Sequence, residues 1–437
     1  MALRHQVVRR RGAALAPLLA AVVLAGCSST GRSATPTTSR TGPAASTMSP
    51  SRTTVVPPSS ATTSATTSTT VPAGACVPSP AVWPDARLAA QLLMVIGSFT
   101  SLGTLTPEPA AGVGGLVFLG QPPATRRTAI RAGLARLGAA AITAGEVEPW
   151  MSTDTEGGPV SRLAGVLGPL PSARRMAATW TTAQVEAAMQ ERGTALRGLG
   201  ITMDLAPVLD TASPTDAVAD EAQRSFSATP SVVARYGSAY AAGLRAGGVV
   251  AVGKHFPGLG HASADTDTGP ATVPPLATLR AADLVPFEQA VAAGLPVVMV
   301  GDPIVPGLTG GLPASLSPAA YALLASTLHF SGVTMTDSLA AGAIADAGYS
   351  ESRAAVTAVE AGADMAMVSA STWQSALEAL ERAIGSGAST RTRAQAAAER
   401  VLAAKGIRSC GGPRTGSQLH GARSDRSPVG SSPGQPG

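Results

Sequence analysis

One short segment concentrates groups that can bind hydroxyls or transfer protons in a chain that is otherwise poor in charge. It runs KHFPGLGH from Lys254 to His261 and continues to Asp265 and Asp267. Only 14% of the 437 residues are charged, and two of the five histidines lie in this segment. A glycine-rich loop at a strand end commonly carries function, because the strand aims the loop and the glycines let it turn. Taken alone, the segment is equally compatible with a surface turn that holds incidental polar residues.

Further acidic and basic side chains follow other apolar runs of the chain, each at the C-terminal end of its run. They are Asp154, Glu156 and Arg162, then Asp204, Asp210 and Arg224, and finally Asp302 and Asp337. No Cys/His cluster has metal-ligand spacing and no Ser-His-Asp pattern is evident, so we expect neither a metal nor a cofactor. Carboxylates combined with basic groups that bind hydroxyls fit sugar chemistry, in which a carboxylate attacks the anomeric carbon.

The elements that must position these residues form eight repeats of a strand followed by a helix. Apolar runs predict strands at 92–97, 115–120, 149–153, 201–207, 249–254, 296–301, 332–336 and 364–369, and alanine-rich stretches predict helices such as 181–199, 231–246, 317–328 and 351–361. Short apolar strands separated by helices are typical of a parallel sheet buried on both faces. Eight units favour a (β/α)8 barrel over an open sheet, and no glycine-rich dinucleotide fingerprint opens the first helix.

The N-terminal 27 residues have the pattern of a secretory signal. Arginines precede an apolar stretch at 13–24 that is too short to span a membrane. The run LAGC that ends at Cys27 resembles the bacterial lipobox, which predicts a lipid anchor on the outer face of the cell membrane. An ordinary signal peptide cut near a chance cysteine is the alternative, and the sequence does not decide between Sec and twin-arginine export.

The folded part is expected at 76–410, between a Ser/Thr/Pro-rich tether at 28–75 and a tail at 411–437 that are both too polar to form a core. The net charge of +5 owes much to these ends, so it does not indicate a nucleic-acid partner, and we expect none. We also expect a monomeric protein. Cys76 and Cys410 flank the folded part. In an exported protein such a pair predicts a disulfide that joins the two ends, with free thiols as the alternative.

Five motifs, in the same order, resemble glycoside hydrolase family 3, and more narrowly its single-domain β-N-acetylglucosaminidase branch. They are DTEGGPVSR at 154–162, APVLD at 206–210, RSF at 224–226, KHFPG at 254–258 and TDSL at 336–339. The resemblance covers about residues 85–405 and implies a retaining mechanism with Asp337 as nucleophile. It also implies that five residues bind the terminal N-acetylglucosamine of a cell-wall glycan: Asp154, Arg162, Arg224, Lys254 and His255.

The chain departs from the family pattern where the general acid is expected. The branch ends its long loop in Asp-Ser-His, whose histidine protonates the leaving oxygen, whereas this chain has DTD at 265–267. Other departures are Leu259 and Asp302 in place of histidines and Pro159 in place of an arginine. Either Asp267 is the acid, with a pKa raised by Asp265, or His261 in the same loop replaces it. The third alternative is a weakened hydrolase or a sugar-binding protein without a general acid.

Overall fold

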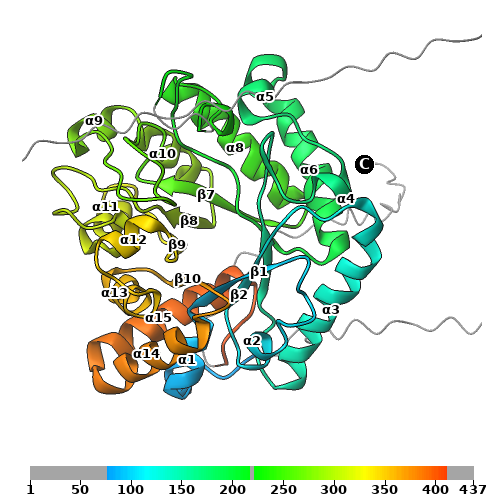
Figure 1. Cartoon of the computed structure of the whole chain (residues 1–437), viewed down its shortest axis with the longest axis vertical. Helices are drawn as coiled ribbons and strands as arrows, with labels where there is room; N and C mark the ends of the chain where they lie inside the picture. Colours follow the sequence, from blue (N-terminus) through cyan, green and yellow to red (C-terminus); the bar gives the residue numbers. More distant parts are fainter. Residues whose placement is uncertain (1–75, 217–220, 411–437) are drawn as a thin grey trace, which may run out of the picture. The chain divides into compact units, whose positions relative to one another are not determined.

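The computed structural model describes residues 76–216 and 221–410, which form a closed barrel of eight parallel strands with helices around it (Figure 1). The strands are β1 (Leu93–Ser98), β2 (Gly115–Leu119), β3 (Trp150–Thr153), β6 (Met203–Asp204), β7 (Val250–Phe256), β8 (Val297–Val300), β9 (Val333–Ser338) and β10 (Met365–Ser369). Each barrel strand pairs with the next one along the chain, and β10 closes the barrel against β1. The predicted (β/α)8 fold is therefore confirmed.

Helices surround the barrel; the first precedes β1, the last two follow β10, and the others lie between strands in the sequence (Figure 1). They are α1 (Asp85–Gln91), α2 (Pro107–Ala110), α3 (Arg127–Thr143), α4 (Ala164–Leu167), α5 (Ala173–Thr179), α6 (Thr182–Leu199), α7 (Glu221–Arg224), α8 (Pro230–Ala246), α9 (Leu276–Ala281), α10 (Leu284–Ala292), α11 (Pro318–Ser326), α12 (Gly342–Asp346), α13 (Glu351–Ala361), α14 (Trp373–Ser386) and α15 (Ala388–Ala404). Three short 3-10 helices are η1 (Pro80–Val82), η2 (Ala124–Arg126) and η3 (Ala314–Leu316), and a hairpin of β4 (Thr155–Gly157) and β5 (Val160–Ser161) follows β3.

Alternate residues of the barrel strands belong to two separate buried clusters. One cluster joins the strands to the surrounding helices, and it includes Leu93, Leu116 and Phe118. The other includes Met94, Trp150 and further methionines and valines of the strands. Since side chains alternate between the two faces of a strand, the second cluster fills the inside of the barrel. The packed interior leaves space for polar groups beyond it, where the strands end.

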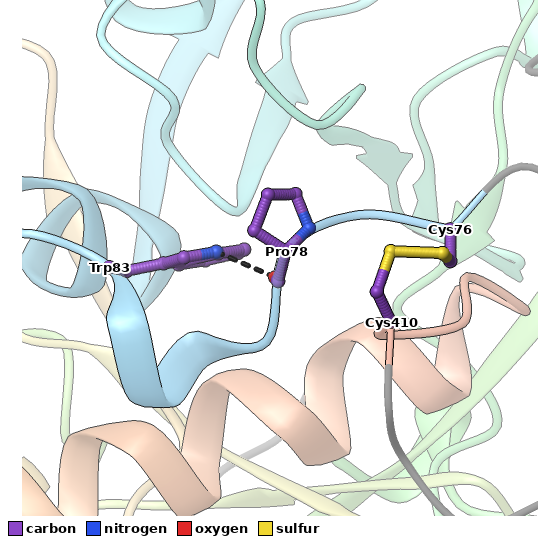
Figure 2. Close-up of a disulfide and its surroundings, with 4 residues drawn as sticks. All are labelled: Cys76, Pro78, Trp83 and Cys410. Atoms are coloured by element: carbon purple, nitrogen blue, oxygen red, sulfur yellow. Dashed lines mark hydrogen bonds between the residues drawn. A yellow bond between two sulfur atoms is a disulfide. The ribbon is translucent and has the colours of Figure 1, made fainter.

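The two ends of the described chain meet at one place. A disulfide joins Cys76 to Cys410 with a Cα–Cα distance of 5.1 Å (Figure 2). Backbone hydrogen bonds lie beside it, from the Val77 N–H to the Arg408 carbonyl (3.0 Å) and from the Cys410 N–H to the Val77 carbonyl (2.8 Å). The Trp83 indole N–H donates to the Pro78 carbonyl at 2.8 Å (Figure 2). The predicted bridge between the borders of the folded part is thus present in the structure.

No helix within 76–216 or 221–410 is both long and apolar enough to cross a membrane. The signal peptide and lipobox predicted at 1–27, the tether at 28–75 and the tail at 411–437 lie outside the described residues.

Candidate active site

A cavity of about 780 Å³ lies at the C-terminal ends of the barrel strands. Its apolar part comes from the last inward-facing residues of the strands, such as Ile96, Met299 and Met367. All but one of the residues to which the sequence assigned a catalytic or sugar-binding role line it: Asp154, Arg162, Arg224, Lys254, His255, Asp265, Asp267 and Asp337. Barrel closure therefore brings together residues from distant parts of the chain on the face where such barrels carry active sites.

Two carboxylates and three cations form a network on one side of this cavity. The Lys254 ammonium contacts Asp154 Oδ1 at 2.8 Å and Glu156 Oε1 at 2.7 Å. The Arg224 guanidinium donates to both oxygens of Glu156 at 2.8 and 2.9 Å, and Arg162 lies 3.6 Å from Asp154. Burial opposes the ionisation of Glu156 and of Lys254, but the opposite charges around each group outweigh this effect. The pKa of Glu156 is therefore well below its usual range, and the pKa of Lys254 is raised.

Glu156 pairs with two of these cations, a role that the sequence did not reveal. It is almost fully buried and is shared by Lys254 and Arg224, so it fixes both cations relative to each other. The signal was present in the sequence, because Glu156 lies two residues after Asp154 and side chains two apart along an extended segment face the same way. Its partners, however, come from other strands and could not be read from that spacing.

Buried Asp210 holds the imidazole of His255, whose other side faces Asp337. The His255 Nδ1 lies 2.7 Å from Asp210 Oδ2, while Asp210 Oδ1 accepts from the Leu259 N–H at 2.7 Å. The other ring nitrogen, Nε2, lies 3.9 Å from Asp337 Oδ2. Burial would lower the pKa of His255, but the carboxylate of Asp210 raises it. The surroundings thus favour the protonated imidazole, whose Nε2 also lies 3.4 Å from the Arg224 guanidinium. Asp210 is a second residue whose role was missed.

Asp337 lies near the end of β9 and its carboxyl is partly exposed to the cavity, at 23% of its side chain. Its Oδ1 accepts from the Ser338 N–H at 2.8 Å, which restricts the rotation of the carboxyl. The barrel strand holds its backbone, and the open space in front of it is the cavity. This position matches the nucleophile that the family resemblance implies.

The loop that carries Asp265 and Asp267 is docked against the segment that follows Asp337. The Gly342 N–H donates to the Asp267 carbonyl at 2.9 Å, and the Ala343 N–H donates to the Thr266 carbonyl at 3.1 Å. A side chain at position 342 would come within 2.5 Å of the loop backbone at Thr268, so only glycine permits this approach. The docking places Asp267 at the cavity on the same side as Asp337.

The carboxyl of Asp267 lies at the exposed rim of the cavity, and its environment favours the protonated form. Partial loss of water is the largest cause, and the charges of Asp337 and Asp265 add to it, so the pKa of Asp267 is raised. Asp265 Oδ1 also accepts from the Asp267 N–H at 2.9 Å, which fixes the backbone of this short run. Both effects suit a group that must hold a proton.

His261 is the one residue with a predicted catalytic role that does not line the cavity. Its Nδ1 lies 3.3 Å from Asp216, and its Nε2 lies 3.8 Å from Asp283. The loop packs closely before this point, because a Cβ on Gly260 would come within 1.8 Å of the Thr211 carbonyl oxygen. The imidazole of His261 thus contacts Asp216 and Asp283 and does not line the cavity to which Asp337 is exposed, which argues against His261 as the acid.

Asp302, which replaces a histidine of the family pattern, lies behind the site. It is 1% exposed, its Oδ1 accepts a hydrogen bond from the Ser315 hydroxyl, and its Oδ2 has no hydrogen-bond partner among the described residues. Burial and the charge of Asp337 raise the pKa of Asp302 well above its usual range. The surroundings of Asp302 therefore favour its neutral form.

Comparison with known proteins agrees with this arrangement. The sequence pattern of the Glycosyl hydrolase family 3 N terminal domain matches residues 110–404. The chain belongs to glycosyl hydrolase family 3. The resemblance inferred from the five motifs is confirmed, and the protein is a glycosidase.

Several family 3 relatives are similar over most of the barrel. Beta-hexosaminidase LpqI of Mycobacterium tuberculosis is 42% identical over 264 residues, which cover 59% of this chain and 68% of LpqI. A beta-hexosaminidase of Xanthomonas campestris is 34% identical over 256 residues, 56% of this chain and 74% of that protein. The crystal structure of a family 3 glycosyl hydrolase from Mycobacterium smegmatis has a TM-score of 0.68 at 38% identity, and it covers 74% of this chain and 98% of that chain.

A beta-N-acetylhexosaminidase structure from Beutenbergia cavernae has a TM-score of 0.69 at 30% identity and covers 74% of this chain and 99% of that chain. Family 3 members that are built of little more than this barrel therefore exist, and the described part of the chain spans nearly all of them.

Proposed function

We propose that this family 3 glycosidase is a retaining exo-β-N-acetylhexosaminidase. In this proposal it removes terminal N-acetylglucosamine from cell-wall glycans, acts as a monomer and uses no metal or cofactor. The observation that carries the proposal is the presence of Asp337 and Asp267 at one cavity, one presented by a barrel strand and the other by a loop docked beside it. The relatives named beta-hexosaminidases support the choice of sugar.

The first chemical step forms a bond between the sugar and the enzyme. The ionised carboxylate of Asp337 attacks the anomeric carbon, the bond to the leaving oxygen breaks, and Asp267 gives its proton to that oxygen. His255 Nε2 lies 3.9 Å from the carboxyl of Asp337. The products of this step are a glycosyl ester on Asp337, an ionised Asp267 and the free aglycone.

The second step returns the enzyme to its starting state. Once Asp337 is an ester it carries no charge, so one of the causes that raise the pKa of Asp267 disappears. Asp267 is then an ionised base, which takes a proton from water while the water oxygen attacks the anomeric carbon. The ester bond between the sugar and Asp337 breaks, which frees the sugar and returns Asp337 to its carboxylate and Asp267 to its acid form. Two displacements at the same carbon retain the β configuration.

The network of Asp154, Lys254, Arg224 and Arg162 supplies the contacts that hold the terminal sugar. Carboxylate oxygens accept from sugar hydroxyls, and the ammonium and guanidinium groups donate to them. Because these groups already pair with one another, they are fixed before the sugar arrives, which lowers the entropy lost on binding.

The second candidate is a sugar-binding protein that cleaves its ligand slowly or not at all. Its basis is the absence of the family's acid/base histidine from the DTD run at 265–267. The raised pKa of Asp267 and its place at the cavity favour the enzyme.

The proposed activity is tested with the full chain and aryl β-glycosides. We expect hydrolysis of an aryl β-N-acetylglucosaminide and much weaker hydrolysis of the matching aryl β-glucoside, because the cavity would bind the N-acetyl group. Proton NMR during turnover should show the β anomer of the sugar first, as two displacements require. Saturable sugar binding without aryl glycoside turnover would support the binding protein instead, and early appearance of the α anomer would exclude a retaining mechanism.

We further propose that the enzyme is exported and lipid-anchored through Cys27. The support is the signal-like sequence before Cys27, and a relative from Arthroderma benhamiae, 33% identical over 261 residues, is named a secreted glycosyl hydrolase. Cys27→Ala should move the protein from the membrane fraction to the soluble fraction, because the thiol that carries the lipid is gone. Immunoblots of both fractions check this, with Ser28→Ala as the matched control. Equal membrane association of the Cys27→Ala and Ser28→Ala proteins would contradict the anchor.

A further inference from the structure

Thr155 lies between Asp154 and Glu156. Its N–H, its hydroxyl and its carbonyl each form a hydrogen bond. Asp204 Oδ1 accepts from the Thr155 N–H at 2.9 Å, and Asp204 Oδ2 accepts from the Thr155 hydroxyl. On the other side, the Tyr240 hydroxyl donates to the Thr155 carbonyl at 2.5 Å. Asp204 belongs to β6 and Tyr240 to α8, so two elements distant in sequence fix this single residue.

The fixed position of Thr155 determines where its two neighbours point. Asp154 and Glu156 line the cavity and Thr155 does not, as expected for successive residues of an extended segment, whose side chains alternate. Asp154 and Glu156 in turn hold Lys254 and, through Glu156, Arg224. A small rotation at Thr155 would therefore disturb the sugar-binding network as a whole.

Asp204 does not contact the cavity, and its burial is unfavourable for the folded state. It is fully buried at 0% exposure, and the only hydrogen bonds to its carboxylate among the described residues come from Thr155. A buried carboxylate is costly unless it is well paired, so an apolar or amide side chain would serve packing better. Its presence under the sugar-binding network points to a role in positioning.

The charged and titratable groups that interact with Asp204 come from four neighbouring segments. They are Asp154 after β3, Lys254 of β7, Arg192 of α6 and Tyr240 of α8. Burial raises the pKa of Asp204 to about 7, while the two bonds from Thr155 and the charge of Lys254 oppose the rise. The carboxyl thus changes its charge near neutral pH.

The contacts between Asp204 and Thr155 are strongest when the carboxyl is ionised. An ionised carboxylate can accept from both the N–H and the O–H of Thr155. Once one oxygen carries a proton, the Thr155 hydroxyl must turn to accept it, and the bonds lose the contribution of the charge.

We propose that Asp204 is a positioning residue for sugar binding, and that its ionised carboxylate holds Asp154 and Glu156 in place through Thr155. The inference rests on the proposed binding of the sugar by Asp154 and Lys254. It predicts that KM depends on whether the carboxyl of Asp204 is ionised, because the residues that bind the sugar would move. The rate constant kcat should change little, because the nucleophile Asp337 keeps its place on its strand.

The test measures kcat and KM of the full chain for an aryl β-N-acetylglucosaminide between pH 5.5 and 8.5. In the wild type, KM should rise as the pH falls through about 7. Asp204→Asn should raise KM about 10-fold at pH 8, which corresponds to the loss of one charge-assisted hydrogen bond. It should change kcat by less than about 3-fold. It should also remove the rise of KM near pH 7. Glu288→Gln, which removes an exposed carboxylate from α10, should match the wild type.

Changes at Thr155 separate positioning from a general effect on folding. Thr155→Val removes the hydroxyl and should raise KM as Asp204→Asn does, whereas Thr155→Ser keeps the hydroxyl and should restore the wild-type KM. The double variant Asp204→Asn/Thr155→Val should be no worse than either single change, because both remove the same interaction. If Asp204→Asn does not fold, the Thr155 pair alone decides, since the inference requires that valine and serine differ.

The failure of this inference can be told apart from the failure of the proposed function. If Asp154→Asn leaves KM unchanged, the proposed sugar-binding network is wrong. If Asp154→Asn raises KM but Asp204→Asn does not, or if the KM rise near pH 7 persists in Asp204→Asn, Asp204 has no positioning role. Equal KM values for Thr155→Val and Thr155→Ser would overturn the inference in the same way.

Discussion

Asp337→Ala is expected to abolish hydrolysis of aryl glycosides and of natural disaccharides alike. Without the carboxylate no glycosyl ester can form, and neither a good leaving group nor general acid help can replace that bond. By comparison with other catalytic nucleophiles, we expect a loss of about 10⁴-fold or more in kcat. Steady-state kinetics on both substrates, with the folded state checked by circular dichroism, measure the effect.

Two controls make this result specific for nucleophilic attack. Asp302→Asn replaces the neighbouring acid of raised pKa with a neutral amide and should keep activity within about 10-fold. In Asp337→Ala the space left by the carboxyl can admit azide, which should restore part of the rate on the aryl glycoside and give an α-glycosyl azide. A β-glycosyl azide, or loss of activity in Asp302→Asn equal to that in Asp337→Ala, would contradict the assignment.

Asp267→Asn is expected to affect substrates according to their leaving groups. An unactivated disaccharide needs a proton on its leaving oxygen, so its rate should fall about 10²–10⁴-fold, whereas an aryl glycoside with a stable phenolate should lose little in the first step. The pH profile gives a second reading. Since Asp267 must be protonated and its pKa is raised, activity on the disaccharide should fall as the pH rises through that pKa. Asp267→Asn should remove this decline.

Two further variants decide where the acid lies. Asp267→His restores an imidazole beside Asp265 and should raise the rate on natural disaccharides, because a histidine near neutral pH is an efficient proton donor. His261→Ala should show no dependence on the leaving group, since the His261 ring faces Asp216 and Asp283. If His261→Ala shows that dependence and Asp267→Asn does not, His261 is the acid. If neither does and Asp267→His gains nothing, the sugar-binding protein becomes the better proposal.

The sequence by itself determined the fold class and most of the site. Eight short apolar runs, each bounded by turn residues, specify strands buried on both faces, and the polar residues at their ends specify which end carries the site. The limits of individual strands were less certain. Residues 201–207 were expected as one strand, but β6 spans only Met203–Asp204. Beyond it the segment still accepts single backbone bonds, from the Val252 N–H to the Ala206 carbonyl at 2.9 Å and from the Lys254 N–H to the Pro207 carbonyl at 3.1 Å. Pro207 has no N–H to donate in return, and an isolated bridge follows at Val208.

Only the tertiary structure decided which of these residues act together. Asp154 and Lys254 are 100 residues apart in sequence, and their contact exists because the barrel closes. Glu156 and Asp210 became anchors of Lys254 and His255 for the same reason. His261 and Asp267 lie in one loop, and their spacing suggested equal access to the site. In the structure the loop packs against Thr211 next to His261, which does not line the cavity. The same loop is hydrogen-bonded to Gly342 at Asp267, which does line it. Side-chain type and periodicity are local properties, whereas direction and partnership depend on contacts between segments that the chain brings together only on folding.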